Sequence, residues 1–370
     1  MNTSSRTHAG ALLIIDLDAI CENWRSLKSR VGTTHCAAVV KADAYGLGAQ
    51  HVAPALYRAG CRHFFVAHVD EALALRPLLA ADATLYVLHG APPGAEPVFP
   101  AHDIVPVLNS LPQLAAWRAL AQQLGKTLPA VLQVDTGMAR LGLSAAELDL
   151  VSHDPDLLQG IDLTLIMSHL VSAEEAGNPI NTGQLARFRA ALRRLPPTAA
   201  SLANSSGIFL GADYHFDLVR PGAALYGIAP AAGIDNPQRA VIHLRGKVIQ
   251  TRLIDSGTAV GYNHRWTARR PSRIVTVAIG YADGYLRSLS NSGYAHFHGI
   301  RLPVVGNVSM DTITIDATDT AEGALQEGTL IDLACPLNPV DTVAERAGTI
   351  GYEILTSLGN RYARSWTGGQ

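Results

Sequence analysis

Short apolar runs alternate with amphipathic helical stretches from Leu12 to about residue 230 of the 370-residue chain. The runs lie at 11–17, 35–41, 63–67, 84–88, 103–108, 129–135, 161–169, 198–204 and 216–222. Strands that are separated by helices form parallel sheets, so this order predicts a (β/α)8 barrel of the TIM type with seven or eight strands in the series. An open, doubly wound sheet is the alternative. No GxGxxG follows the first run, which argues against a dinucleotide-binding version of that sheet.

The pattern changes near residue 235. Beyond it, strand-like runs are separated by Gly, Asn, Asp and Ser with little helical periodicity, at 242–254, 273–280, 301–306, 311–317 and 328–334. Such a pattern is typical of an antiparallel β domain, here with helical pieces near Val343 and Glu353. We therefore predict a barrel over 11–235 and a mainly antiparallel β domain over 236–370, to which a strand from 1–10 could be added.

Composition excludes several classes of protein. A net charge of −2 without a basic cluster gives no reason to expect nucleic acid as a partner. The first apolar run, at 11–15, is too short for a signal peptide or a membrane span. The cysteines show no paired or CxxC spacing, which argues against a disulfide framework and against zinc: Cys21, Cys36, Cys61 and Cys335. We expect a cytoplasmic protein with no metal and no membrane partner.

A lysine ends one of the apolar runs. In AAVVKADAYGLG, at 37–48, Lys41 closes the run and Tyr45 follows four residues later. The carboxyl ends of barrel strands carry the chemistry in this fold, and desolvation there lowers the pKa of a lysine until its amine can act as a nucleophile or base. A lysine that only extends its amine to solvent from a strand end is the alternative.

Other polar groups stand at the ends of later runs, at 135–140, His169, 204–207 and 220–222. Turns rich in Gly and Ser offer backbone amides and a hydroxyl to a phosphate. A lysine, a phosphate-binding turn and cationic side chains at one barrel mouth together suggest pyridoxal phosphate held as a Schiff base. Each feature is weak by itself, because a Ser-Ser-Gly turn is more often only a turn.

The chain resembles the alanine racemase family of barrel-type pyridoxal-phosphate enzymes over essentially its full length. The segments that carry the resemblance are AVVKADAYGLG (38–48), DTGMARLG (135–142), SHLVSAE (168–174), ANSSG (203–207), RPGAALYG (220–227), VGYN (260–263), IGYADGY (279–285), VSMD (308–311) and GYEILTSLGNRYAR (351–364).

The resemblance implies two catalytic bases. Lys41 carries the cofactor and is one base, and Tyr262 of the β domain is the other, acting on the opposite face of the substrate across a subunit boundary. Arg220 contacts the pyridine nitrogen and leaves the ring neutral, since a guanidinium cannot accept a proton. His169 supports Tyr262 and, together with Arg140, supplies positive charge near it.

Further residues follow from the same resemblance. Arg140 contacts the substrate carboxylate, Met310 offers a backbone amide to it, Asp311 shapes the substrate entrance and Tyr281 lines the inner gate. The phosphate is surrounded by Tyr45, Ser205, Gly222, Ala223 and Tyr352. From the residues alone, ordinary structural roles stay open for several of them: sheet aromatics at Tyr262 and Tyr281, a core histidine at His169, and a rim ion pair at Arg220.

Four positions depart from the family pattern. Gln133 stands where many members have a carbamylated lysine that orients the arginine matching Arg140. Ser201 replaces a common histidine that could bond Arg220. Ser309 stands for a usual cysteine and Asn307 for a frequent arginine. These residues belong to the carboxylate-binding side of the site, so we expect the departures to affect the substrate range and the turnover.

The resemblance implies an alanine racemase that interconverts L- and D-alanine as a homodimer with shared active sites. Its role would be the supply of D-alanine for peptidoglycan, or the catabolic use of D-alanine. A racemase of broader range or of serine is the alternative within the same mechanism. A non-enzymatic pyridoxal-phosphate carrier is the alternative outside it, and the additional β domain carrying Tyr262 argues against a carrier.

Overall fold

The protein is described by a computed structural model that covers residues 8–231, 233 and 235–369. These residues form two compact units. The barrel unit comprises the described residues of 20–239, and the β unit comprises 8–19 and 240–368. Among the described residues, no helix has the length and apolar character that a bilayer crossing requires.

Eight parallel strand positions form the barrel unit. Seven strands lie in chain order in one sheet: β3 (Ala38–Val39), β4 (His63–Val66), β5 (Thr84–Val87), β6 (Ile104–Leu108), β7 (Leu128–Gln133), β8 (Ile161–Met167) and β9 (Ala200–Ser201). The eighth, β10 (Leu218–Val219), pairs in parallel with β2 (His35–Cys36), which continues into β3. Apolar residues fill these strands because both faces of a parallel sheet are covered.

Backbone hydrogen bonds close this sheet into a barrel. The amides of Ala37 and Val39 donate to the carbonyls of Val219 and Pro221, each at 2.9 Å, which joins the last strand to the first. The amide of Arg220 donates to Ala203 at 2.9 Å and joins β10 to β9. The prediction of a (β/α)8 barrel is confirmed, and the open sheet is excluded.

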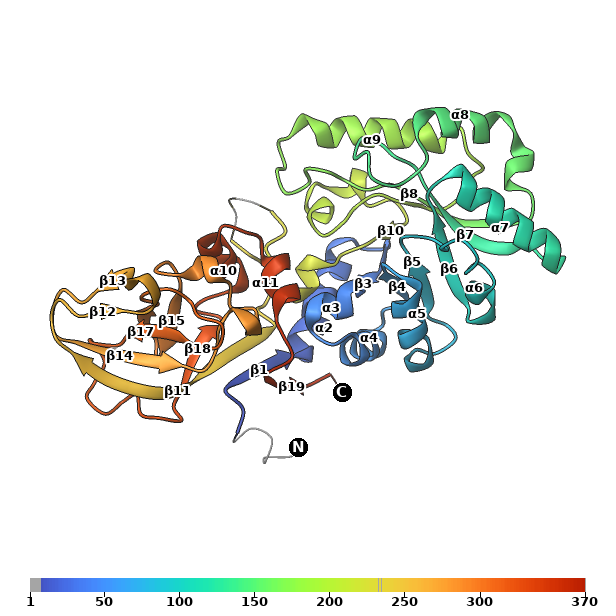
Figure 1. The fold of residues 1–370 in the computed structure, drawn as a ribbon. Coiled ribbons are helices and arrows are strands. Elements are labelled where there is room, and N and C mark those ends of the chain that lie inside the picture. Colours follow the sequence, from blue (N-terminus) through green and yellow to red (C-terminus); the bar gives the residue numbers. More distant parts are fainter. Residues whose placement is uncertain (1–7, 232, 234, 370) are drawn as a thin grey trace. The chain divides into compact units, whose positions relative to one another are not determined.

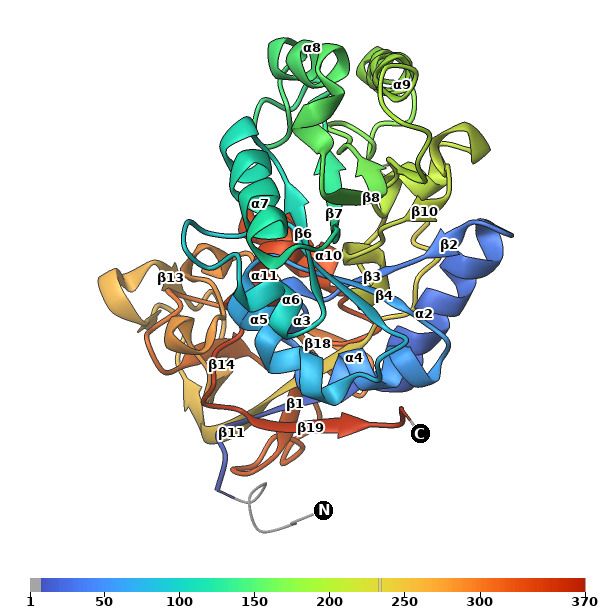
Figure 2. The same cartoon turned by 90° about the vertical axis from the view of Figure 1, so that its right-hand side faces the viewer.

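Helices connect the strands: α2 (Leu17–Arg30), α4 (Ala49–Arg58), α5 (Val69–Leu75), α6 (Val98–Ala101), α7 (Leu111–Leu124), α8 (Ala145–His153) and α9 (Pro179–Leu192). Figures 1 and 2 show α7, α8 and α9 outside strands β6, β7 and β8. Helix α7 begins at Ser110, whose hydroxyl caps the amide of Gln113, and ends at Gly125 with φ of 60°, where a residue without Cβ is favoured.

The first apolar run is not a barrel strand, and this part of the prediction is wrong. Strand β1 (Ala11–Asp16) pairs antiparallel with β11 (Ile242–Ile254) and parallel with β19 (Ala363–Thr367), both in the β unit. Its side chains alternate between buried and half-buried, as in a strand that covers one face of a core. The suggested additional strand from 1–10 falls mainly on residues 1–7, which lie outside the described residues.

The β unit is built around the long strand β11, which pairs with β1, β14 (Ser272–Val277) and β18 (Leu330–Ala334). The remaining elements are β12 (Ala259–Val260), β13 (Trp266–Thr267), β15 (Tyr294–Phe297), β16 (Ile300–Pro303), β17 (Ile313–Asp316), α10 (Val340–Ala347) and α11 (Gly351–Ser357). All sheet pairs except β1 with β19 are antiparallel, as predicted for this domain.

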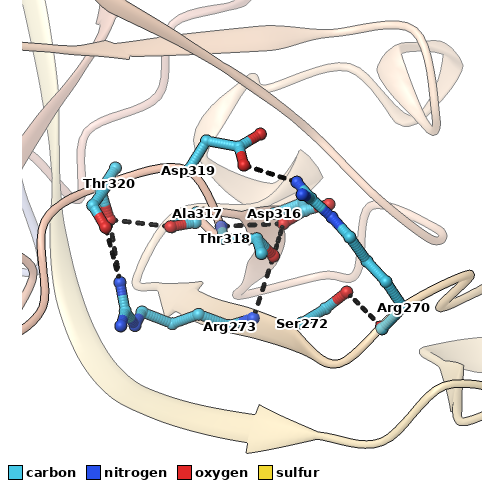
Figure 3. Close-up of polar contacts among 8 residues, drawn as sticks. All are labelled: Arg270, Ser272, Arg273, Asp316, Ala317, Thr318, Asp319 and Thr320. Atoms are coloured by element: carbon cyan, nitrogen blue, oxygen red, sulfur yellow. Dashed lines mark hydrogen bonds and ion pairs between the residues drawn. The ribbon is translucent and has the colours of Figure 1, made fainter.

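A polar turn after β17 is tied to the start of β14 (Figure 3). The Asp316 carboxylate accepts from the amide of Thr318 at 3.0 Å and from its hydroxyl. The Thr318 hydroxyl oxygen in turn accepts from the amide of Arg273 at 3.0 Å. Near this network, Arg270 and Asp319 form an ion pair in which both side chains are exposed.

We expect Asp316→Ala to lower the free energy of unfolding of the β unit by about 1–2 kcal/mol, because it leaves half-buried donors of Thr318 without an acceptor. Asp319→Ala removes an exposed ion pair and should change stability by less than about 0.5 kcal/mol. Urea unfolding of both variants measures the difference. Equal losses would contradict the importance that we assign to Asp316.

Candidate active site

Lys41 lies at the carboxyl end of the first barrel strand, two residues after Val39, the last residue of β3. Its side chain is half-buried. Burial lowers the pKa of Lys41 below the usual 10.5, the charge of Arg140 lowers it further, and Glu71 opposes these effects. Because a lower pKa leaves more of the amine uncharged, the position suits a nucleophile or base rather than a solvated lysine.

The four residues after Lys41 turn in the left-handed direction. Residues 42–45 have φ between 52° and 57°, although none of them is glycine. Asp43 holds the turn to helix α4 by accepting the Gly48 amide on its carbonyl at 2.9 Å and the Ala49 amide on its carboxylate at 2.7 Å. The turn brings Tyr45 back toward the last barrel strand.

Tyr45 reaches the turn after β10. A Cβ at Gly222 would collide with the Tyr45 hydroxyl, so only glycine allows this approach. The Ser205 hydroxyl accepts from the amides of Gly222 at 2.9 Å and Ala224 at 3.2 Å. Hydroxyls of Tyr45 and Ser205 and the amides of the 222–224 turn therefore meet at one place in the barrel, as a phosphate site requires. Ala223 belongs to the same turn.

Arg220 is buried with neutral partners. Its guanidinium donates to the carbonyl of Ser168 at 2.6 Å and to the hydroxyl of Ser201. Ser201 donates its own proton to the carbonyl of Leu218 at 2.5 Å, which leaves its oxygen free to accept from Arg220. Burial lowers the pKa of Arg220. None of these partners is a carboxylate, so the rim ion pair considered above is not what holds Arg220. The serine retains a bond to it although the family histidine is absent.

Arg140 extends from a loop that Asp135 organises. The Asp135 carboxylate accepts three amides, from Gly137 and Met138 at 2.8 Å and from Ala139 at 3.0 Å. Gln133 is buried and donates to the carbonyl of Leu141, at 3.2 Å, the residue directly after Arg140. The amide at the position of the family lysine thus binds the backbone of the arginine loop.

His169 follows β8 and is held through its backbone, where Gln184 donates to its carbonyl at 2.9 Å. Burial lowers the pKa of His169 to about 3, and the charges of Arg220, Arg140 and Lys41 act in the same direction. The imidazole is therefore neutral near pH 7. Burial thus disfavours the positive charge that was expected of His169, and Arg140 is the cation of that pair.

Tyr262 belongs to the β unit and is 70% exposed. It follows Gly261, which has a φ of 74°, and its carbonyl accepts from the side-chain amide of Asn307 at 2.9 Å. A cavity of about 440 Å³ adjoins it, lined by Gly261, Tyr262, Thr276, Asn307, Ser309, Thr312 and Thr314. Hydroxyl and amide side chains thus line the cavity beside the predicted second base.

Tyr281 and Met310 are held together by their backbones. The amide of Tyr281 donates to Ser309, and the amide of Ala282 donates to Met310, each at 3.0 Å. Gly280 has no room for a Cβ against these carbonyls. Both side chains are exposed, at 41% for Tyr281 and 53% for Met310.

Asp311 is fixed by Arg361, which donates to it at 2.7 Å and binds the buried carboxylate of Asp283 at 2.6 and 2.9 Å. Tyr352 lies on α11 and is half-buried. The structure thus groups the predicted residues into two sets. The barrel set is Lys41, Tyr45, Arg140, His169, Ser205, Arg220, Gly222 and Ala223, and the β set is Tyr262, Tyr281, Met310, Asp311 and Tyr352.

Sequence reasoning did not assign a role in the site to two further residues of the barrel unit, Ser201 and Glu71. Ser201 binds Arg220, whereas the sequence marks it only as a polar residue within an apolar run. Glu71 contacts the backbone next to Lys41, yet in sequence it is an ordinary acidic residue in the first turn of a helix.

Comparisons with known proteins match both units of the chain to one family. The family profile described as "Alanine racemase, N-terminal domain" matches residues 15–230, and "Alanine racemase, C-terminal domain" matches 241–366. A protein named alanine racemase from Brucella abortus (strain 2308) is 53% identical over 369 residues, covering 96% of this chain and 93% of that protein. One named "Alanine racemase, catabolic" from Agrobacterium fabrum (strain C58 / ATCC 33970) is 51% identical over 358 residues, covering 97% and 92%.

Solved structures of alanine racemases have the same fold as this chain. The crystal structure of alanine racemase from Bartonella henselae with covalently bound pyridoxal phosphate superposes with a TM-score of 0.93 at 46% identity, covering 97% of this chain and 100% of that chain. That of the biosynthetic alanine racemase from Pseudomonas aeruginosa superposes with a TM-score of 0.90 at 32% identity, covering 97% and 100%.

We expect Ser201→Ala to lower the free energy of unfolding by about 1–3 kcal/mol, because it leaves a buried guanidinium donor and the Leu218 carbonyl without a partner. Ser26→Ala, at an exposed position of helix α2, should cost less than about 0.5 kcal/mol. Denaturant unfolding of the cofactor-free proteins compares them. If the two serines contribute equally, Ser201 has no particular part in holding Arg220.

Proposed function

The chain belongs to the alanine racemase family, and we propose that it interconverts L- and D-alanine with pyridoxal phosphate as its cofactor. The observation that carries the proposal is the position of Lys41 at the end of the first barrel strand, in the same barrel mouth as the Tyr45–Ser205–Gly222 group. A half-buried amine and a phosphate site in one parallel barrel are the two attachment points that this cofactor needs.

The barrel residues fit the cofactor. Tyr45, Ser205, Gly222 and Ala223 would surround the phosphate, and the amides of Gly222 and Ala224, which donate to the Ser205 hydroxyl, hold that hydroxyl beside the turn. Arg220 would hold the ring nitrogen with an N–H donor and, as a buried guanidinium, would give it no proton. When bound, the cofactor supplies an electron-withdrawing system that stabilises the negative charge left when an amino acid loses its α-proton.

Two bases would then move that proton. Lys41 would accept or return it at Nζ on one face of the α-carbon, and Tyr262 would do so at Oη on the other face. The lowered pKa of Lys41 suits this task, because the amine must lose its own proton near neutral pH to act as a base. Arg140 would bind the substrate carboxylate, with Met310 offering an amide, Asp311 shaping the entrance and Tyr281 lining the gate.

A homodimer would bring the two sets together. Large side chains of the β unit are exposed in the single chain, among them Tyr262, Tyr281 and Met310. Exposed aromatic residues and methionine are enriched at protein interfaces. In this proposal the barrel unit of one subunit holds the cofactor, with Tyr352 near the phosphate, and the β unit of a second copy supplies Tyr262.

The proposed cellular role is the supply of D-alanine for peptidoglycan in the cytoplasm. The name of the Agrobacterium relative points instead to breakdown of D-alanine. A broader substrate range that includes serine is the second candidate. The cavity beside Tyr262 favours it, since the threonines Thr276 and Thr312 line that space and their hydroxyls could bind a polar side chain.

Proton NMR of the pyridoxal-phosphate-loaded protein in D2O tests the function. Loss of each α-proton signal is followed with a panel of L- and D-amino acids, and chirality is read at the end. Exchange with racemisation of alanine alone supports the proposal. Exchange of the α-proton of serine as well as alanine would support the second candidate, a racemase with a broader substrate range. No exchange with any amino acid, despite bound cofactor, would refute the proposal and favour a carrier.

We expect Tyr262→Phe to reduce racemisation of alanine by about 10²–10⁴-fold, the usual contribution of a general base. Because Lys41 remains, the α-proton of one alanine enantiomer should still exchange with D2O, whereas that of the other should not. NMR of each enantiomer measures both effects. Tyr57→Phe, on helix α4 away from the site, retains the Tyr262 hydroxyl and serves as the control. Equal residual exchange of both enantiomers would contradict the assignment of one base to each face.

We expect Arg140→Gln to slow the attachment of pyridoxal phosphate to Lys41 at pH 7. The positive charge of Arg140 lowers the pKa of Lys41, so its removal raises that pKa toward 10.5 and leaves less uncharged amine. The pH profile of attachment, followed by absorbance, should move to higher pH. Arg118→Gln, on the exposed surface of α7, should leave it unchanged. A profile that moves to lower pH would contradict the electrostatic argument.

A further inference from the structure

The carboxylate of Glu71 ties the turn after Lys41 to the neighbouring barrel strand. One oxygen accepts from the amide of Ala42 at 2.6 Å. The other accepts from the amides of Ala67 at 2.8 Å and His68 at 3.1 Å, directly after β4. Three N–H groups from the ends of two adjacent strands therefore meet on a single half-buried side chain.

The bond to Ala42 fixes the peptide unit that leaves Lys41. The Ala42 amide belongs to the peptide group between residues 41 and 42, so its direction sets ψ of Lys41 and with it the orientation of the lysine backbone. Ala42 is also the first of the four left-handed residues. Each such residue costs about 1–2 kcal/mol relative to the right-handed region, so contacts from outside the turn must hold it in place.

Glu71 also contributes charge. The charged or titratable groups that act on Lys41 come from four elements: Glu71 on α5, His89 after β5, Arg140 after β7 and His169 after β8. Arg140 lowers the pKa of Lys41 and Glu71 raises it. Burial and the nearby cations hold the pKa values of His89 and His169 below 6.5. Glu71 is therefore the anion of this group.

We propose that Glu71 is a positioning residue for Lys41, which fixes the backbone from which the amine extends and balances the positive charge of Arg140. The role rests on the proposed function of Lys41 as cofactor attachment point and base. A purely structural alternative exists, because Glu71 also accepts the amide of His68, the residue before helix α5, and so caps that helix. Capping alone would affect stability but not the titration of Lys41.

The test is the reactivity of Lys41 in the cofactor-free protein. Trace labelling with acetic anhydride is measured by peptide mass spectrometry across a pH series, with the exposed Lys126 as internal reference. In Glu71→Gln the labelling curve of Lys41 should move to lower pH, because the charge that opposes Arg140 is gone. Asp70→Asn removes an exposed carboxylate from the adjacent position and should leave the curve in place.

A double variant separates charge from backbone strain. Glycine adopts the left-handed region without steric cost, so Glu71→Gln/Ala42→Gly should keep the turn and still show the shifted curve, even where Glu71→Gln alone fails to fold. In the loaded enzyme, Glu71→Ala should lower kcat for alanine by about 10–100-fold with little change in KM, as expected when a reacting group is misplaced.

The outcomes are distinct from those that test the racemase. Labelling requires neither cofactor nor substrate, so a shifted curve in a protein that racemises nothing refutes the proposed function and leaves the positioning role intact. An unmoved Lys41 curve in folded Glu71→Gln and in the double variant overturns the positioning role, whatever the activity. A loss of stability without that shift assigns Glu71 to helix capping only.

Discussion

The hydrogen bonds between the last and first barrel strands support the rest of the candidate site. Ala37 and Val39 donate to Val219 and Pro221, and this pairing sets the turn after β10 beside the turn after β3. The contact between Tyr45 and Gly222 follows from it. Residues far apart in the sequence become neighbours because the sheet closes, and an open sheet of the same strands would leave its first and last strands on opposite edges.

Positively charged side chains outnumber carboxylates around Lys41 in the barrel unit. Arg220 is satisfied by carbonyls and a serine hydroxyl, which leave its positive charge uncompensated and able to act on a bound group. His169 stays neutral because burial and neighbouring cations disfavour a second proton. The charges that act on the pKa of Lys41 are therefore those of Arg140, which lowers it, and Glu71, which raises it. A change in the position of either side chain would change how much of the amine is protonated.

The barrel, the β domain and most residues of the candidate site could be predicted from the sequence. Strand and helix periodicity and the spacing of polar residues at strand ends are local signals. The partner of a strand is not a local signal: the run at 11–17 is apolar at nearly every position and reads equally well as a barrel strand or as part of β11's sheet. The left-handed turn was not predictable either, since Ala-Asp-Ala-Tyr carries no glycine to mark it. Ser201 and Glu71 act through contacts with backbone groups that no motif specifies.

The placement of β1 has a consequence for synthesis. Strand β1 belongs to the β unit but precedes the barrel in the sequence. Leu13 can therefore pair with Leu244 and Arg364 only after all residues of the barrel have been synthesised. During translation the apolar strand β1 would stay unpaired until β11 and β19 are synthesised. An unpaired apolar strand can aggregate or bind chaperones. The residues of the barrel unit are therefore all synthesised before β11, whereas the β unit is completed last, when β19 pairs with β1.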